Sequence, residues 1–180
     1  MTLGPQTIGI GPQRIGGSGS SIKQSLCQVS ITHPSPAFTV AVTGTGDNDL
    51  DPTVYAANFV TLLNGYSEQL NSGSAFETQP DGRVKVLAAG AVVVSAYADI
   101  EHTANNTTAG AVFSIERNAV TILSPRSVHA RLPNTGDIGN LAGIGSFNAQ
   151  AGDIVGVALA SDTTGSLSVR ASSLVFEMFT

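Results

Sequence analysis

Short runs of apolar residues, separated by turn-forming glycine, proline and asparagine, recur along most of this 180-residue chain. Many runs alternate apolar with polar positions, which is the period-2 pattern of a strand with one buried face. The segment 25–32 is an example, because one face carries Cys27, Val29 and Ile31. Short strands at this spacing predict an all-β sandwich of two packed sheets.

The C-terminal segment 150–179 carries the strongest pattern. A Gly152-Asp153 turn leads into the run 154–160, which is apolar on both faces and is therefore expected to be covered on both. One cover is the core of the domain. The other face, which is suited to a second layer or a second subunit, carries Ile154, Gly156, Ala158 and Ala160. After a loop at 161–165, the pattern predicts a half-buried strand at 167–171 and a final apolar strand at 174–179.

The middle of the chain supplies the remaining strands. They are expected at 37–42, 83–87, 91–100, 111–116, 119–123, 127–131 and 144–149. Arg117-Asn118 predicts a tight turn, in which Asn118 takes a positive φ. The segment 51–65 is ambiguous, because Asp51 could cap a short helix while the apolar residues after Val54 could equally form a strand. We favour a short helix or helical turn there.

The first 21 residues differ from the rest. Gly4-Pro5-Gln6-Thr7-Ile8-Gly9 recurs as Gly11-Pro12-Gln13-Arg14-Ile15-Gly16. Proline removes amide donors and glycine adds chain entropy, so such a segment cannot hold a core of its own. We expect residues 1–21 to form an extended arm before a domain at 22–180; a disordered tail is the alternative. As an arm it would attach to another protein, through Pro5, Gln6, Ile8, Pro12, Gln13, Arg14 and Ile15.

Three stretches carry a resemblance to a known family. They are GRVKVLAAGAVVVSAYADI, FSIERNAVTI and FNAQAGDIVGVAL. In this order, over about residues 72–180, they resemble the C1q/TNF-like jelly-roll family. The chain departs from the pattern at Ala91, where the family has an aromatic residue, and at Ala119, where it has glycine. The resemblance implies a jelly-roll β-sandwich whose first and last strands pair, and a homotrimer.

The resemblance also suggests a function, since many bacteriophage structural proteins look like this domain. It implies a phage capsid decoration protein that trimerises through Ile154, Gly156, Ala158 and Ala160 and binds the major capsid protein or another virion protein through its arm. The alternative is a tail-fibre or baseplate tip module that binds a host receptor, with loops at 101–110 and 133–142.

Composition supports a structural role. Charged residues make up 12% of the chain, against roughly a quarter in typical globular domains, which suits a surface covered in an assembly. A net charge of -5 without a basic patch argues against nucleic-acid binding. The N-terminus lacks the charged start and apolar core of a signal peptide, and no apolar run reaches bilayer length. We therefore expect assembly in the host cytoplasm, a location on the virion surface and no membrane contact.

Candidate chemistry is sparse. Cys27 has no second cysteine and is expected to be a buried core residue. The alternating carboxylates of the 47–51 loop depart from the calcium-binding pattern at Pro52 and Asn58, although a weaker loop site stays open. The histidines, His33, His102 and His129, lack metal-ligand spacing. The sequence thus predicts no enzyme and no cofactor, and it assigns no metal site beyond the open question of calcium at Asp47, Asp49 and Asp51.

Overall fold

The computed structural model describes residues 24–31, 38–63 and 66–179. Within these ranges one short 3-10 helix, η1 (Ala56–Asn58), accompanies the strands. The strands are β1 Gln24–Ile31, β2 Phe38–Val42, β3 Val60–Thr61, β4 Ser67–Ser72, β5 Phe76–Thr78, β6 Val84–Val86, β7 Gly90–His102, β8 Thr107–Arg117, β9 Val120–Leu123, β10 Val128–Leu132, β11 Ile138–Ala149, β12 Ile154–Ser161 and β13 Gly165–Phe179. The expected arm lies outside the described residues, and so do its attachment residues Pro5, Gln6, Ile8, Pro12, Gln13, Arg14 and Ile15.

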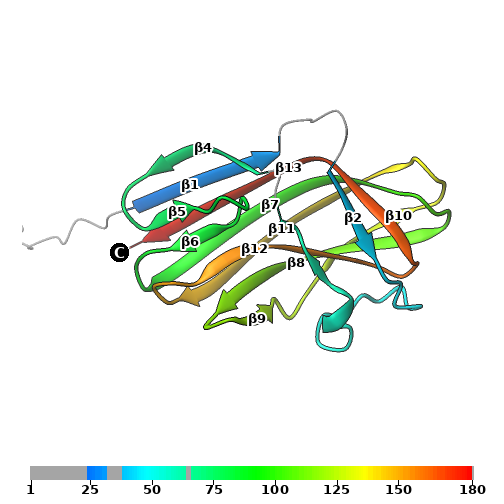
Figure 1. Ribbon diagram of the computed structural model, residues 1–180, viewed down its shortest axis with the longest axis horizontal. Coiled ribbons are helices and arrows are strands. Elements are labelled where there is room, and N and C mark those ends of the chain that lie inside the picture. Colours follow the sequence, from blue (N-terminus) through cyan, green and yellow to red (C-terminus); the bar gives the residue numbers. More distant parts are fainter. Residues whose placement is uncertain (1–23, 32–37, 64–65, 180) are drawn as a thin grey trace, which may run out of the picture.

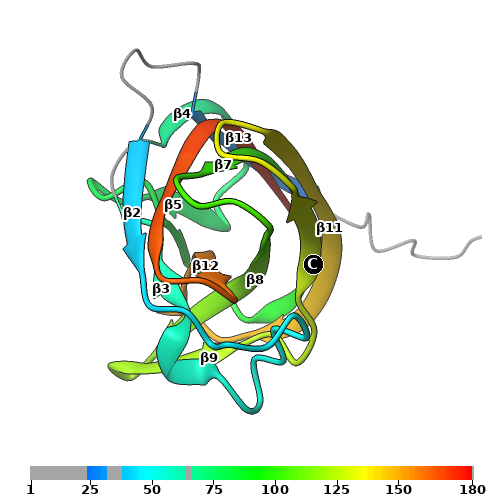
Figure 2. The same cartoon turned by 90° about the vertical axis from the view of Figure 1, so that its right-hand side faces the viewer.

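The strands form two antiparallel sheets that pack face to face. The six-stranded sheet has the order β11-β7-β13-β1-β4, with β2 also paired to β13. The seven-stranded sheet has the order β10-β8-β12-β6-β5, with β3 also paired to β12 and β9 to β8. Figure 1 shows the strands running along the long axis, and Figure 2 shows the two sheets enclosing a common interior. The fold is a jelly-roll β-sandwich, as the sequence predicted.

The first and last strands pair along the whole of β1, from Gln24 opposite Phe179 to Ile31 opposite Ser172. The sequence predicted two C-terminal strands, but the structure contains one strand, β13. Its register against β7 shifts between Val169 and Ala171, because Arg170 forms a bulge. The extra residue reverses the alternation, so that both apolar halves of β13 face the interior.

The core lies between the sheets and follows the alternation in sequence. Leu174, Phe176 and Met178 of β13 are all fully buried. The Phe176 ring contacts Phe76 of the opposite sheet, with ring centroids 5.9 Å apart. Burial of each such side chain contributes about 1.5–3 kcal/mol, which makes this layer the main source of stability.

Two turns bring distant residues together at the end of the sandwich where β1 begins and β13 ends. Asn118 and Ala119 both have positive φ, 52° and 61°, as in a type I′ hairpin turn, which confirms the turn expected there. Gly152 also has positive φ, and Asp153 beside it is buried. The Asp153 carboxylate accepts hydrogen bonds from Arg117 Nε (2.8 Å) and Nη2 (2.7 Å) and from the Gln150 N–H (2.8 Å). The Arg117 hydrogen bonds hold the pKa of Asp153 below its ordinary value.

The segment 43–63 lies against the outer face of the seven-stranded sheet. The sequence left a short helix or a strand open for residues 51–65, and the structure contains a short example of each: the 3-10 helix η1 and the two-residue strand β3. Asp51 does not cap the helix; its Oδ1 accepts a hydrogen bond from the Thr53 N–H at 2.8 Å and closes a turn. Leu62 N–H donates to the Val157 carbonyl at 2.7 Å, which fixes the segment to β12.

Candidate functional site

The structure corrects the assignment of β12 to an open interface. Ala158 and Ala160 have no exposed surface, because Leu50 and Phe59 of the segment 43–63 pack over them. Both faces of β12 are covered, as its apolar run predicted. However, the second cover is this same segment of the chain rather than a second subunit.

The other two predicted interface residues are also occupied within the chain. Gly156 is buried, and a Cβ there would lie 3.1 Å from Cγ of Arg83. Ile154 is half-buried next to them. The Arg83 guanidinium itself pairs with Asp81 and Glu116 at 2.8 and 2.7 Å. A neighbouring copy would have to displace these contacts before it could reach β12.

Five large apolar side chains that are exposed in the single chain lie on the outer face of the six-stranded sheet, while Val120 and Ile122 are exposed on β9 of the seven-stranded sheet. We define the outer sheet face as the solvent-facing side of β11, β7, β13, β1 and β4. Ile144 on β11 is 75% exposed and pairs with Ser95, which pairs with Val175. Leu70 on β4 is exposed in the same row, Tyr97 is exposed in the next row, and Ile138 and Phe179 are exposed farther along the sheet. Apolar side chains therefore recur across the whole width of this face.

Charge is scarce on the central part of the outer sheet face. In the rows through Ala91, Val93, Ser95 and Tyr97, the described partners on β1, β4, β11 and β13 include one carboxylate, Glu177. Toward the loop end, Tyr97 Oη donates to Asp99 Oδ1 at 2.6 Å, and this hydrogen bond raises the pKa of Tyr97. A largely uncharged, partly apolar sheet face is typical of a surface that another protein covers.

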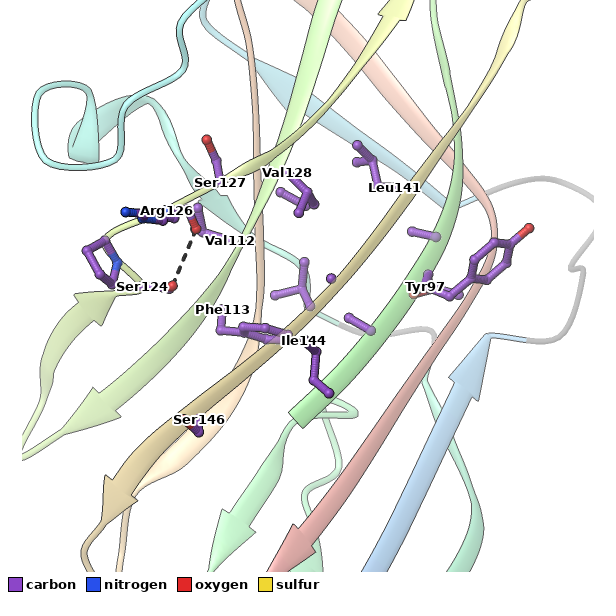
Figure 3. A pocket seen from close by; sticks show the side chains of 17 residues that line it. Tyr97, Val112, Phe113, Ser124, Arg126, Ser127, Val128, Leu141, Ile144 and Ser146 are labelled. Carbon is purple, nitrogen blue, oxygen red and sulfur yellow. Dashed lines mark hydrogen bonds between the residues drawn. The ribbon is translucent and has the colours of Figure 1, made fainter. Parts of the chain in front are cut away.

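A pocket of about 430 Å³ opens beside this face, where β11 approaches β8 and β10. Small side chains on facing strands leave the space unfilled: Ala96 and Ala98 on β7, Ala111 on β8 and Gly143 on β11. Larger apolar side chains complete the lining (Figure 3), namely Phe113, Val128, Leu141, Ile144 and Val157. The pocket opens to solvent, so it is a cleft at the edge of the sandwich and not an enclosed void.

The polar rim of the pocket comes from the connection between β9 and β10. Figure 3 shows Ser124, Arg126 and Ser127 together at one side. The two serine hydroxyls donate to backbone carbonyls, Ser124 to Arg126 and Ser127 to Leu50. Arg126 is exposed, and no carboxylate in the described residues forms an ion pair with it.

A polar cluster closes the end of the sandwich opposite Gln24 and Phe179. Arg131 donates to Asn48 Oδ1 at 2.8 Å and to Thr108 Oγ1 at 2.9 Å, and it lies 3.6 Å from Asp162. Nearby His102 is buried, and its Nδ1 accepts a hydrogen bond from the Ala104 N–H at 2.8 Å. Burial lowers the pKa of His102. These contacts tie the loops together and leave His102 in its neutral form near pH 7.

Most of the described residues that the sequence offered as candidates for metal binding or catalysis are buried or form hydrogen bonds with nearby side chains. Asp47 Oδ2 accepts from the Tyr55 hydroxyl at 2.9 Å, and the described ranges contain no group of three or more His, Cys, Asp or Glu side chains that could hold a metal. Cys27 is buried, and desolvation raises the pKa of its thiol to about 11. Ser127 contacts His129 Nε2, but in the described residues no carboxylate accepts a hydrogen bond from that ring. His33 lies outside the described residues.

The fold places the chain in the TNF/C1q-like jelly-roll class. Among solved structures, it is similar to murine APRIL, with a TM-score of 0.54 and 16% identity over 87% of this chain and 99% of that chain. It is also similar to Eiger TNF from S. frugiperda (TM-score 0.55, 10% identity, 85% and 92% covered). A third similar structure is the globular domain of zebrafish complement 1qA (TM-score 0.53, 9% identity, 87% and 96% covered). No protein-family model and no curated protein matches the sequence.

Sequence reasoning missed the outer sheet face because the pattern in β11 is inverted. In the segment IGNLAGIGSFNA, glycines 139, 143 and 145 face the interior and Ile138 and Ile144 face solvent. A Cβ at Gly139 would lie 2.6 Å from Leu132, so glycine is required for β11 to approach β10 this closely. The alternation of glycine with isoleucine in this segment could have indicated that the isoleucines face outward.

Proposed function

We propose that this chain is a structural protein of a bacteriophage particle, a homotrimeric capsid decoration protein that binds the particle through its N-terminal arm. The observation that carries the proposal is the outer sheet face, where exposed apolar side chains stand on a broad and sparsely charged sheet. Such a face is stable in water when another copy covers it. The low charged fraction and the shared jelly-roll fold support the same proposal.

Trimerisation involves the outer sheet face rather than β12. A closed ring of three copies covers this face on every copy and leaves none of it open. Ile144 and Phe179, which are 75% and 46% exposed in the single chain, become buried in this arrangement. The arm residues from Pro5 to Ile15 then attach each copy to the major capsid protein or another virion protein. Three weak attachments per trimer add to a stable one.

Sedimentation velocity on the full chain tests the trimer. The wild type is expected to sediment at about three times the chain mass of 18.3 kDa, and Ile144→Asp as a single chain. Val54→Asp is the matched control, because Val54 is 67% exposed but lies in the segment 43–63, away from the outer sheet face. A wild type that sediments as a single chain, or an Ile144→Asp variant that remains trimeric, would contradict this interface.

Removal of residues 2–21 tests the arm. The shortened chain is expected to remain a trimer but to be lost from purified particles, as measured by quantitative gel bands. Copy number separates decoration from a receptor-binding tip, because decoration proteins are present in hundreds of copies and tips in a few to dozens. Normal incorporation of the shortened chain would refute attachment through the arm.

A further inference from the structure

The pocket between β8, β10 and β11 shares Ile144 and Tyr97 with the outer sheet face, but its deep part lies between the sheets, away from the proposed trimer contacts. Its volume of about 430 Å³ falls within the range of ligand-binding pockets, roughly 300–1,000 Å³. The deep part is lined by Ala98, Ala111, Leu141 and Val157, which lie in the core between the sheets. These side chains offer no charge and no hydrogen bond. The deep part of the pocket therefore suits an alkyl chain.

The rim of the pocket has the opposite character. Within the described ranges, Arg83, Arg117, Arg131 and Arg170 each form an ion pair with a carboxylate, and Arg126 does not. Arg126 is also the one arginine that lines the pocket. The rim serines Ser124 and Ser127 already donate to backbone carbonyls. The group available to a ligand at this rim is therefore a cation whose geometry matches a carboxylate.

We infer that the pocket binds a medium-chain fatty acid or a similar amphipathic carboxylate. The alkyl chain lies between the two sheets, against Phe113 and Val128, and the carboxylate pairs with Arg126 at the rim. Ile144 lies over the mouth from the β11 side and covers the first methylene groups.

Small side chains give the site its selectivity for a narrow, flexible ligand. Ala96 and Ala98 leave space along the interior side of β7, and larger residues at these positions would fill it. Each methylene that enters an apolar site contributes about 0.8 kcal/mol, a factor of about four in Kd. Affinity is therefore expected to rise roughly fifteenfold from hexanoate to octanoate and again to decanoate, since each step adds two methylene groups.

Isothermal titration calorimetry on the full-length protein tests the inference with decanoate, with decanol as the uncharged ligand of equal chain length. Wild type is expected to bind decanoate more tightly than decanol. Arg126→Gln is expected to weaken decanoate binding roughly tenfold, since it removes a charge-assisted contact, and to leave decanol unchanged. Lys85→Gln, a cation on β6 away from the pocket, is the control and should alter neither.

A second pair of variants tests the alkyl part. Ala98→Leu is expected to weaken both ligands at least tenfold, because its added atoms occupy the pocket. Ala98→Val, with fewer added atoms, provides an intermediate loss if the leucine variant fails to fold, as checked by circular dichroism. The inference is overturned if decanoate gives no saturable heat, if Arg126→Gln binds it as wild type does, or if the folded Ala98 variants bind both ligands normally. The Arg126 and Ala98 variants leave the exposed side chains of the outer sheet face unchanged, so sedimentation and particle binding report on the proposed function separately from these titrations.

Discussion

Replacement of Asp153 by asparagine tests how strongly one buried ion pair stabilises the sandwich. Asp153 is 1% exposed, and its carboxylate receives two hydrogen bonds from Arg117 and one from the Gln150 backbone. Asparagine keeps the shape and can still accept from Gln150, but it presents an uncharged group to the guanidinium. Removing one partner of a buried pair typically costs 3–5 kcal/mol, and the retained hydrogen bond favours the lower end, about 3 kcal/mol.

The same substitution in an exposed pair provides the control. Glu101 pairs with Arg170 through similar geometry, but the two side chains are 24% and 39% exposed. Exposed pairs contribute about 0–1 kcal/mol, so Glu101→Gln should have little effect. For a chain of this size, about 3 kcal/mol corresponds to a fall in Tm of roughly 6–12 °C for Asp153→Asn.

Differential scanning calorimetry and urea denaturation at pH 7 measure both variants. Equal losses for Asp153→Asn and Glu101→Gln, or no loss for Asp153→Asn, would refute the argument from burial. The pH dependence of the unfolding free energy provides a second test of the ion pair. The pKa of Asp153 is lowered in the folded chain, so its stabilisation is present above the ordinary value of 3.8 and is lost as pH falls through the lowered pKa. The difference in unfolding free energy between the wild type and Asp153→Asn should therefore become smaller as pH falls below 3.8.

Four further predictions concern single residues. Burial lowers the pKa of His102, so stability should decrease as pH falls from 6.5 toward that lowered value, and urea midpoints between pH 7.5 and 5.5 should shift less in His102→Gln. The Cys27 thiol, with its pKa raised to about 11, should react with a thiol reagent at least roughly 100-fold more slowly in the folded than in the urea-unfolded chain. Ala119→Gly should raise the unfolding free energy by about 1 kcal/mol, because φ of +61° is unfavourable for alanine. Gly44→Ala should lower it by about 1–3 kcal/mol in urea titrations, because the new Cβ would lie 2.6 Å from the Thr164 backbone nitrogen.

Local sequence patterns predicted the elements whose environment is fixed by burial. Alternation identified β1 and the final strand, and their pairing is present as the resemblance implied. Asn118 and Gly152 marked turns, because positive φ at these positions restricts the residue types that fit. The two-sided burial of β12 was also readable from its unbroken apolar run.

The identity of the covering element could not be read in the same way. The apolar face at Ala158 and Ala160 requires a cover, but sequence periodicity does not distinguish a second subunit from the segment 43–63. The segment 43–63 contains little regular secondary structure and contacts Ala158 and Ala160 through two separate side chains, Leu50 and Phe59. Such isolated contacts leave no periodic pattern in the sequence. The pocket was also not predictable, because it arises where small residues from several strands meet in space.

The register of β1 against β13 also determines where added polypeptide would leave the molecule. Gln24 lies opposite Phe179, so any sequence joined before the first strand or after the last one emerges from the same end of the sandwich (Figure 1). The turn at Asp162–Thr164 lies at the far end, close to Thr108 and Arg131. A tag joined before β1 or after β13 would therefore lie far from the loop contacts of Arg131 and Asp162 and leave them intact.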